Sequence, residues 1–350
     1  MHPIPLAGLA NSKQAMTMTM TMTMKYKALL TAVTLTSVIG SSGVMAQASP
    51  TIAVVAKVGG IPWFNAMEMG IEQMGEELGV EAYMVGPTSA DPALQVRAIE
   101  DLISRGVDVI GVVPNDREVL EPVLERAREQ GIIVLTHESP ESVNIDYDFE
   151  MISAQQLGEE HAKLLAETTG CEGSYAVYVG GLSVPAHNAW ADAAVNWLDE
   201  NCAGLTQAAE RFGVAESVDD SRNTTLDLLR AHEDLAGIMS FGSQGTIGAA
   251  RAVKERGLEG DVAVLGLFSP GQGRRLVHEG VITGGFQWSP LEAGKAFVAL
   301  GEMLYNGEEI TDGAELPVLG DITLDGHTIF ASQPLELNKE TVDELAELGL

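Results

Sequence analysis

The chain has 350 residues, with 20 Lys and Arg against 50 Asp and Glu, and a formal net charge of −30. This charge excludes nucleic acid and anionic lipid as expected partners, because both require a basic surface. A hydrophobic content of 45% is enough for a full core, and the length suggests about two domains. Acidity spread along the chain favours a salt-adapted, halophilic surface, with an ordinary acidic surface as the alternative.

The N-terminus predicts export. A basic start is followed by an apolar run over residues 28–44, which Thr, Ser and Gly interrupt, so the run is a poor membrane span. The run closes with Ala46-Gln47-Ala48, which predicts signal-peptide cleavage before Ser49. The stretch before it is of low complexity. Residues 1–48 are therefore expected to be a low-complexity start and a signal peptide, and the mature protein is expected to be periplasmic.

From residue 51 onward, short β-branched runs alternate with helical patterns, which is repeated βαβ and predicts a parallel sheet with helices on both faces. The first series consists of strands over residues 51–57, 80–86, 107–113, 131–136 and 143–148, with helices over 63–78, 92–105 and 118–130.

The same pattern then restarts. It consists of helices over residues 153–168, 187–201, 224–232, 246–256 and 290–306, strands over 174–179, 205–212, 236–241, 261–267 and 281–287, and a tail over 328–348 with an extended piece and a last helix. The predicted fold class is α/β, with two doubly wound parallel-sheet domains joined by a hinge. We assign 49–148 plus 269–317 to an N-terminal lobe and 149–268 plus 318–350 to a C-terminal lobe.

The two cysteines are predicted to form a disulfide. Cys171 precedes the strand expected over residues 174–179, and Cys202 follows the helix expected over 187–201. A strand that runs up a sheet and a helix that returns bring both thiols to the same edge, and export permits the bond. A catalytic or metal-binding role is not indicated, because the two are not closely spaced.

In a doubly wound sheet, ligands bind outside the carboxyl ends of the strands. The residues that follow the predicted strands are mainly amides, hydroxyls, imidazoles and aromatic rings, with one Lys and one Glu, and this mixture suits a small polyhydroxylated molecule. No phosphate-binding glycine loop and no metal-ligand pattern accompanies them, so no cofactor and no metal are expected. The candidate ligand-binding residues are Lys57, Trp63, Phe64, Asn115, His137, Glu138, His187, Asn188, Phe241, Ser243, Gln244, Phe268, Gln287 and Trp288.

Several of these candidates have an alternative structural role. Consecutive Trp63 and Phe64 cannot both face one core stripe, so at least one is expected to face the cleft, and replacing Trp63 by alanine is expected to weaken binding without unfolding the protein. Lys57 and Glu138 either form a buried structural pair or both hold ligand hydroxyls. Phe241 and Phe268 are alternatively core residues, and Asn115 and Asn188 are alternatively turn and cap residues. Trp190 and Trp197, two helical turns apart, are expected in the core.

The segments "AVVAK…IPWFNAMEMGIEQMGEELGV", "ALQVRAIEDLISRGVDVIGVVPND", "LERAREQGIIVLTHES" and "VLGLFSPGQGRRLVHEGVITGGFQW" resemble periplasmic sugar-binding proteins of ABC transporters, of the ribose-binding type. The resemblance covers residues 52–306 and is strongest to the branch that binds autoinducer-2 and rhamnose. It implies two lobes that close over a solute and then dock on a membrane permease. The protein is expected to be a monomer.

The resemblance also assigns residues. Lys57 matches a ligand-binding Lys at the end of the first strand, and Glu138 matches an Asp. Where the branch has Asp-Gln-Asn, this chain has Ala186-His187-Asn188, and where it has Pro-Asp-Ala, this chain has Phe241-Gly242-Ser243. These differences favour a pentose, a related furanose or a short polyol over autoinducer-2 itself.

Other functions find less support in the sequence. A receptor for a signalling furanose is the nearest alternative to a transport receptor. A repressor of the same fold would need a basic helix-turn-helix before the first domain, where this chain has the predicted signal peptide. An enzyme is not expected, because no nucleophile motif, no metal triad and no paired carboxylates at strand ends are found.

Overall fold

The computed structural model of the protein describes residues 49–350, and the predicted signal peptide lies outside the described residues. The described residues form one compact unit. Within the described range, helices that combine the length and the apolarity needed to cross a membrane are absent.

The first sheet contains the N-terminal strands of the described chain. Its strand order is β14-β15-β5-β4-β3-β1-β2, and all neighbouring strands are parallel except the β14–β15 pair. The strands are β1 (Thr51–Val55), β2 (Glu81–Val85), β3 (Val109–Val112), β4 (Ile133–His137), β5 (Tyr147–Glu150), β14 (Thr323–Asp325) and β15 (Thr328–Phe330).

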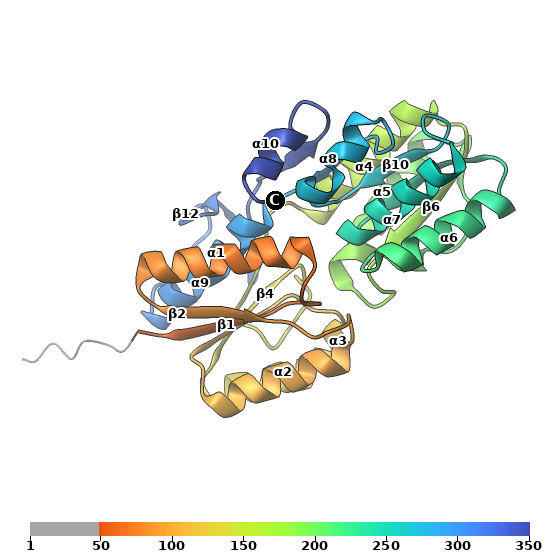
Figure 1. Ribbon diagram of the computed structural model, residues 1–350. Helices are drawn as coiled ribbons and strands as arrows, with labels where there is room; N and C mark the ends of the chain where they lie inside the picture. Colours follow the sequence, from red (N-terminus) through yellow and green to blue (C-terminus); the bar gives the residue numbers. More distant parts are fainter. Residues whose placement is uncertain (1–48) are drawn as a thin grey trace, which may run out of the picture. The chain divides into compact units, whose positions relative to one another are not determined.

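Helices cover this sheet on both faces. Helices α1 (Pro62–Leu78) and α9 (Pro290–Tyr305) run side by side over one face, and α2 (Pro92–Arg105) and α3 (Arg117–Glu129) cover the other (Figure 1). Alternate residues of β1 therefore enter different clusters: Ile52 packs in the cluster that contains α1 and α9, and Ala53 packs in the cluster that contains α2 and α3. A strand buried on both faces explains the continuous apolar run in its sequence.

The close approach of α1 and α9 depends on two glycines. A Cβ added at Gly70 would lie 1.9 Å from the Leu291 carbonyl oxygen, and a Cβ at Gly294 would lie 2.1 Å from that of Met67. Both distances are far inside van der Waals contact, so neither position accepts a side chain unless the helices move apart.

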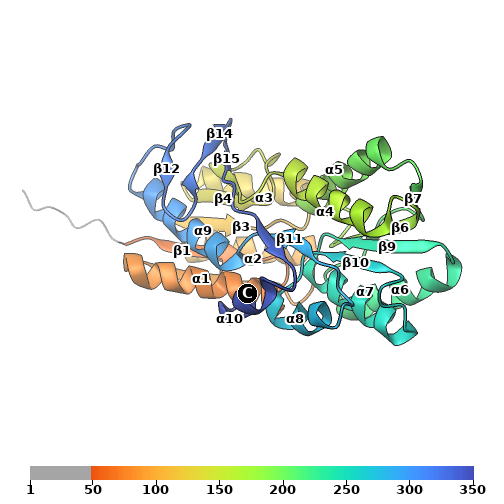
Figure 2. The same cartoon turned by 90° about the horizontal axis from the view of Figure 1, so that it is seen from above.

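The second sheet repeats the same architecture. Its order is β10-β9-β6-β7, with β8 also paired to β6, and all of these pairs are parallel. Helices α4 and α5 pack together on one side, and α6 and α7 on the other (Figure 2). The strands are β6 (Gly173–Val179), β7 (Leu205–Gln207), β8 (Phe212–Gly213), β9 (Leu235–Ser240) and β10 (Ala263–Gly266), and the helices are α4 (Ala154–Thr169), α5 (Pro185–Asn201), α6 (Val218–Ala231) and α7 (Ser243–Arg256).

The remaining elements complete the chain. Helix α8 packs on α10, and two antiparallel strand pairs form from β11 with β16 and from β12 with β13. These elements are α8 (Pro270–His278), α10 (Val342–Glu347), β11 (Gly285–Gln287), β12 (Glu315–Leu316), β13 (Gly320–Asp321) and β16 (Leu335–Leu337).

The α/β class and the doubly wound, mostly parallel sheets are confirmed. The lobe boundaries stay a prediction, although two details of the structure differ from them. Strands β14 and β15 extend the first sheet, whereas residues 318–350 were assigned to the second lobe. Helix α8 packs on α7 and α10, and β11 packs on α4, so residues 270–287 lie with the second sheet and not the first.

The chain passes between the two sheet layers at three adjacent places, after β5, after β11 and after β15. The first and third crossings are hydrogen-bonded to each other: Ala331 N–H donates to Glu150 O at 2.9 Å, and Gln333 N–H donates to Met151 O at 2.9 Å. Adjacent short crossings of this kind are the expected place for a hinge.

The predicted disulfide is present between Cys171 and Cys202, whose Cα atoms are 5.0 Å apart. It closes a loop with a sequence separation of 31, which contributes about 3–4 kcal/mol by the loop-entropy argument.

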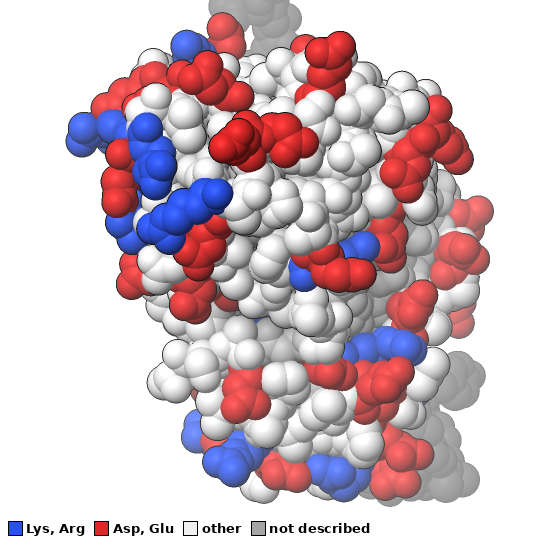
Figure 3. All heavy atoms as spheres, turned by 90° about the vertical axis from the view of Figure 1, so that its right-hand side faces the viewer, with Lys and Arg blue, Asp and Glu red and all other residues white. Residues whose placement is uncertain are grey.

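The surface is acidic, as the composition requires. On the face in Figure 3, Asp and Glu side chains are scattered widely, and Lys and Arg form a few groups beside them. The halophilic origin of this charge stays a prediction.

Candidate functional site

A small cavity lies at the carboxyl ends of the strands of both sheets. Its volume is about 20 Å³, room for about one water molecule. Seven of the residues predicted from the sequence line it. The lining residues are Lys57, Ile61, Trp63, Phe64, Glu138, His187, Trp190, Glu216, Phe241, Gly242, Ser243 and Leu267.

Lys57 is the centre of the polar lining. It follows β1, is 2% exposed, and its Nζ lies 2.6 Å from Glu138 Oε2 and 2.8 Å from His187 Nε2. Glu138 follows β4 of the same sheet, whereas His187 lies in the first turn of α5 beside the second sheet. One buried cation therefore links the two halves of the molecule.

His187 is held as a neutral ring between two donors. Burial, and then the charge of Lys57, lower its pKa well below the usual value. The Gly180 N–H lies 2.9 Å from Nδ1 and the Lys57 ammonium lies 2.8 Å from Nε2, although a neutral ring accepts a hydrogen bond at only one nitrogen. A ligand oxygen that replaced the direct contact between Lys57 and His187 would accept a hydrogen bond from the ammonium group.

Glu138 has an unusual backbone conformation. Its φ is +65°, the left-handed region that non-glycine residues rarely adopt, and such conformations concentrate at functional sites. Oε2 pairs with Lys57, and Oε1 lies 3.8 Å from His137 Nε2. The carboxylate therefore has accepting capacity left for a ligand hydroxyl.

His137 supports the site from the core. It is fully buried and stacks on Phe149 with ring centroids 4.5 Å apart. Its Nδ1 bonds to the Phe149 carbonyl oxygen at 2.7 Å, and its Nε2 accepts a hydrogen bond from Trp288 Nε1 at 3.1 Å. Burial lowers its pKa, so the ring stays neutral and orients Trp288. His137 does not line the cavity.

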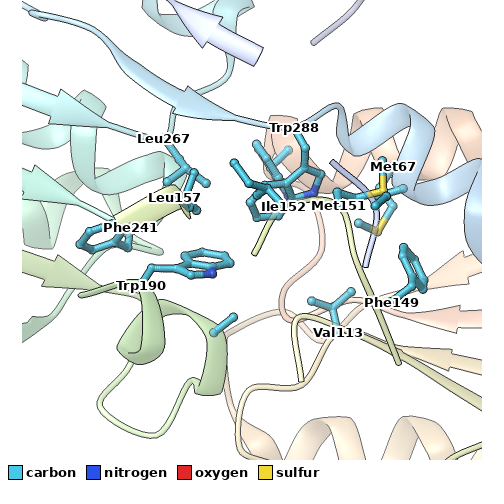
Figure 4. Packing of buried hydrophobic residues seen from close by; sticks show 14 of the residues in the cluster. Met67, Val113, Phe149, Met151, Ile152, Leu157, Trp190, Phe241, Leu267 and Trp288 are labelled. Atoms are coloured by element: carbon cyan, nitrogen blue, oxygen red, sulfur yellow. The ribbon is translucent and has the colours of Figure 1, made fainter. Parts of the chain in front are cut away.

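Aromatic rings form a continuous wall. Trp288 meets Trp63 edge-to-face at 5.4 Å and Trp190 at 5.2 Å, and Trp190 lies 6.5 Å from Phe241. In Figure 4, Trp190 and Phe241 lie on the side of the second sheet, and Trp288 projects toward them from the chain segment that precedes α9. Trp63, Phe64, Trp190 and Phe241 line the cavity, and Trp288 backs two of them.

Two further predicted residues carry unpaired polar atoms. Asn115 donates from Nδ2 to the Lys57 carbonyl oxygen at 2.8 Å, but its Oδ1 is buried without a partner. Gln287 is fully buried, and neither Nε2 nor Oε1 has a partner among the described residues. Buried polar atoms without hydrogen bonds are rare in folded proteins.

The other predicted residues have structural roles. The Asn188 amide caps the turn before α5 by donating to the Gly181, Leu182 and Val184 carbonyl oxygens, and it does not line the cavity. Phe268 packs in the second core cluster, where a Cβ at Gly273 would touch its ring. Gln244 hydrogen-bonds to Ser243 Oγ and to Gln272 Oε1. Ser243 lines the cavity, and Gln244 does not.

Trp190 and Glu216 line the cavity and are absent from the sequence-predicted set. Trp190 is three residues after His187 on α5, and the two rings stack at 5.1 Å. This spacing puts both on one helix face, which is the signal that could have found Trp190. Glu216 follows the two-residue strand β8, and its Oε1 lies 4.0 Å from His187 Nε2.

A second pair of carboxylates lies on β5, just before the first crossing. Asp148 and Glu150 are both buried, and Asp148 Oδ1 accepts hydrogen bonds from Thr136 Oγ1 at 2.7 Å and from Ser139 N–H at 3.1 Å. Burial raises the pKa of Asp148 to about 7. Burial and then the neighbouring Asp148 raise the pKa of Glu150 well above its usual value.

Replacing Asp148 by asparagine is therefore expected to stabilise the protein at alkaline pH. The raised native pKa means that the folded state binds more protons than the unfolded state, so stability falls as the pH rises from about 4 to about 7. Asparagine keeps the Oδ1 acceptor and cannot ionise. We expect a gain of roughly 1–2 kcal/mol at pH 8, a few degrees in Tm, and little change at pH 4.

Thermal unfolding monitored by circular dichroism across pH 4–9 measures this effect. Replacing the exposed Glu141 by glutamine removes the same charge and should leave the pH dependence as in the wild type. A Tm of the Asp148→Asn protein that falls with pH as steeply as the wild type would contradict the assignment.

Among the described residues, no group of three or more His, Cys, Asp or Glu side chains is arranged to hold a metal ion.

Comparison with known proteins gives consistent matches. The family model described as "Periplasmic binding protein domain" matches residues 52–309. The ribose import binding protein of Salmonella typhimurium is 25% identical over 303 residues, which cover 84% of this chain and 96% of that protein.

Two solved structures share the fold. LsrB from Clostridium saccharobutylicum in complex with AI-2 has a TM-score of 0.78 at 18% identity, covering 84% of this chain and 99% of that one. A solute-binding protein of an ABC transporter from Clostridium phytofermentas with bound L-rhamnose has a TM-score of 0.78 at 24% identity, covering 86% and 99%.

Proposed function

The chain belongs to the periplasmic binding protein domain family, and from that premise we propose that it captures a small neutral sugar and delivers it to the permease of an ABC transporter. The sugar is a pentose, a furanose or a related polyol, held where the two sheets meet. The matched relatives and neighbours are named as binding proteins and not as enzymes, which supports a receptor that does no chemistry on its ligand.

One observation carries the proposal: charged and aromatic groups from both sheets converge on one cavity. Lys57 and Glu138 come from the first sheet, His187 and Phe241 from the second, and all of them line it. Aromatic faces pack against the C–H face of a sugar, and the polar groups can exchange hydrogen bonds with its hydroxyls. Asn115, which follows β3, and Gln287, at the end of β11, carry buried amide atoms without partners, and these are further hydrogen-bonding groups at strand ends.

The size of the cavity supports a closing motion. At about 20 Å³ it is too small for a monosaccharide, and Lys57 directly contacts His187 across it. A sugar therefore requires the two sides to separate, and closure follows once its hydroxyls replace the direct contact. The adjacent crossings after β5, β11 and β15 are where such rotation needs the least rearrangement. Because each side contributes part of the site, the ligand favours the closed form.

A receptor for a signalling furanose is the second candidate. The observation in its favour is the structural similarity to a protein solved with AI-2, together with the matching position of Lys57. His187 and Ser243 stand where the sequence resemblance expects other side chains, so we place this candidate second.

A melting-shift screen of the purified mature protein tests the function. The panel comprises D-ribose, L-rhamnose, D-arabinose, D-tagatose, xylitol and AI-2, and calorimetry then gives the Kd of any ligand that raises Tm. We expect a neutral sugar or polyol to shift Tm by several degrees and to be recovered unchanged by mass spectrometry. A shift with AI-2 alone would favour the second candidate. No shift with any compound, or turnover of a ligand, would contradict the proposal.

The cellular location and the oligomeric state of the protein belong to the same proposal. We propose a periplasmic monomer, released by cleavage before Ser49, that does not bind nucleic acid. N-terminal sequencing of the exported protein checks the cleavage site, light scattering checks its mass, and a gel-shift assay checks nucleic-acid binding.

A further inference from the structure

Among the charged residues that line the small cavity, Glu216 is the one whose carboxylate makes no direct contact with Lys57. Its side chain is 9% exposed, and its Oε1 approaches His187 Nε2 only to 4.0 Å, too far for a hydrogen bond. No hydrogen bond to Glu216 is found among the described residues, whereas Glu138 is paired with Lys57 at 2.6 Å. Buried carboxylates without partners are costly, so this one requires an explanation.

The backbone around Glu216 is shaped to admit it. A Cβ added at Gly180 would lie 2.7 Å from Glu216 Oε1 and 3.0 Å from His187 Nδ1. Glycine at this position, just after β6, therefore leaves room for a carboxylate and an imidazole to approach together. Helix α6 begins two residues after Glu216, and Ser217 accepts the Asp220 N–H as its cap, which fixes the turn.

Glu216 also lies where two hollows meet. A larger hollow of about 480 Å³ adjoins the small cavity, and Ile61 and Glu216 line both. Of the described residues that line the larger hollow, none is Lys or Arg, and its polar groups are the carboxylates of Glu216 and Asp220 and the hydroxyls of Thr88, Ser89 and Ser217. Glu216 therefore contributes its carboxylate to the walls of both hollows.

The charges that face Glu216 can be added directly. Lys57 is the only cation among the lining residues of the two hollows, and it faces the carboxylates of Glu138 and Glu216 and the neutral ring of His187. Glu138 already neutralises Lys57. The wall of the small cavity is therefore negative by one formal charge, and Asp220 adds a second negative charge in the larger hollow. Such a wall repels anions and favours hydrogen-bond donors such as hydroxyls.

We propose that Glu216 is a ligand-binding carboxylate that accepts hydroxyl hydrogen bonds and makes the site reject anionic sugars, such as sugar phosphates and uronic acids. The inference rests on the proposed function and deepens it, because it names the ligand class as uncharged and hydroxyl-rich at the end that faces the larger hollow.

Calorimetry on wild type and on Glu216→Gln tests the proposal. The neutral probes are D-ribose, L-rhamnose, D-arabinose and D-tagatose, and the anionic probes are D-ribose 5-phosphate and D-galacturonate. Wild type is expected to bind at least one neutral probe and neither anion. Glu216→Gln is expected to bind that probe about 10- to 100-fold more weakly, since a hydrogen bond to a charged acceptor becomes one to a neutral acceptor. Its discrimination against the anions should also fall.

Asp220→Asn is the matched control, because it removes the same charge from the larger hollow at an exposed position. It should keep the Kd of the neutral probe within about twofold of the wild-type value. This result would show that the effect of Glu216→Gln comes from a lost contact with the ligand and not from the loss of a negative charge at longer range. Tm of Glu216→Gln shows whether it folds as the wild type does. If it does not, Glu216→Asp, which keeps the carboxylate, separates contact from folding: it should bind the neutral probe and still reject the anions, and a Glu216→Asp protein that binds the anions as tightly as the neutral probe overturns the proposal.

The outcomes separate the two proposals. If wild type binds a neutral sugar and Glu216→Gln binds it equally well, or if wild type binds the anions as tightly, only the Glu216 inference is overturned. If wild type binds none of the neutral sugars, the proposed function is overturned and the inference falls with it.

Discussion

Replacing Glu138 by alanine is expected to remove most of the sugar affinity and to destabilise the fold. Lys57 is 2% exposed and its Nζ is 2.6 Å from Glu138 Oε2, so the variant leaves an ammonium group buried without its carboxylate. Breaking one side of a buried ion pair costs about 3–5 kcal/mol of unfolding free energy. The lost acceptor for ligand hydroxyls weakens binding by about 2–4 kcal/mol, roughly 30- to 1,000-fold in Kd. Calorimetry and thermal unfolding measure the two effects separately.

A double variant distinguishes binding from folding. Replacing Lys57 and Glu138 together by methionine removes both buried charges and keeps similar volumes, which is often neutral for stability. We expect Tm to return toward the wild-type value while the sugar affinity stays lost. An affinity that recovers together with Tm would contradict a direct role of Glu138 in binding. A Glu138→Ala protein that binds the sugar with the wild-type Kd would contradict that role as well.

Some elements could be predicted closely because their ends carry local signals. Helix α2 runs from Pro92 to Arg105 as predicted, since Asp91 caps its start and Gly106 ends it with a φ of +70°. Helix α8 was not predicted. Its sequence PGQGRRLVH contains two glycines and is short of apolar residues, and its main packing partner is α10, which lies far away in sequence.

The boundaries of α6 and β8 show the same limit. The helix was expected from Thr224 but begins at Val218, because the Ser217 hydroxyl accepts the Asp220 N–H. The strand expected over residues 205–212 is divided into β7 and the two-residue β8, which pair with different parts of β6. A two-residue strand has no alternation to read, so Glu216, which follows it, was missed.

The rule that ligands bind at the carboxyl ends of strands located half of the predicted set on the cavity. It could not tell which way each side chain points. His137 is the last residue of β4 and turns into the core against Phe149, and Phe268 packs on α8. The expectation that no carboxylates pair at strand ends is wrong. Glu138 and Glu216 line one cavity, each 4.0 Å from His187 Nε2, and Asp148 and Glu150 are neighbours on β5.

Replacing Trp63 by alanine is expected to lower both stability and affinity. The sequence predicts that this change weakens binding without unfolding the protein, but Trp63 is 6% exposed and belongs to the main core cluster as well as to the cavity wall. Its loss leaves a void beside Trp288, whose ring meets it edge-to-face at 5.4 Å. Truncating a buried tryptophan costs about 3–5 kcal/mol, and the lost sugar-facing surface should raise Kd by at least about tenfold.

Two further variants decide what Trp63 contributes. Trp63→Phe keeps an aromatic face and should retain most of the affinity at a smaller loss in Tm. Trp197→Ala removes a half-buried indole from the far end of α5, away from the cavity lining, so it should lower Tm and leave Kd within about twofold. Kd is measured for every variant at a temperature where circular dichroism shows it folded. A Trp63→Ala protein that unfolds early yet binds sugar as the wild type does would make this ring a core residue alone, and the aromatic wall would then begin at Phe64.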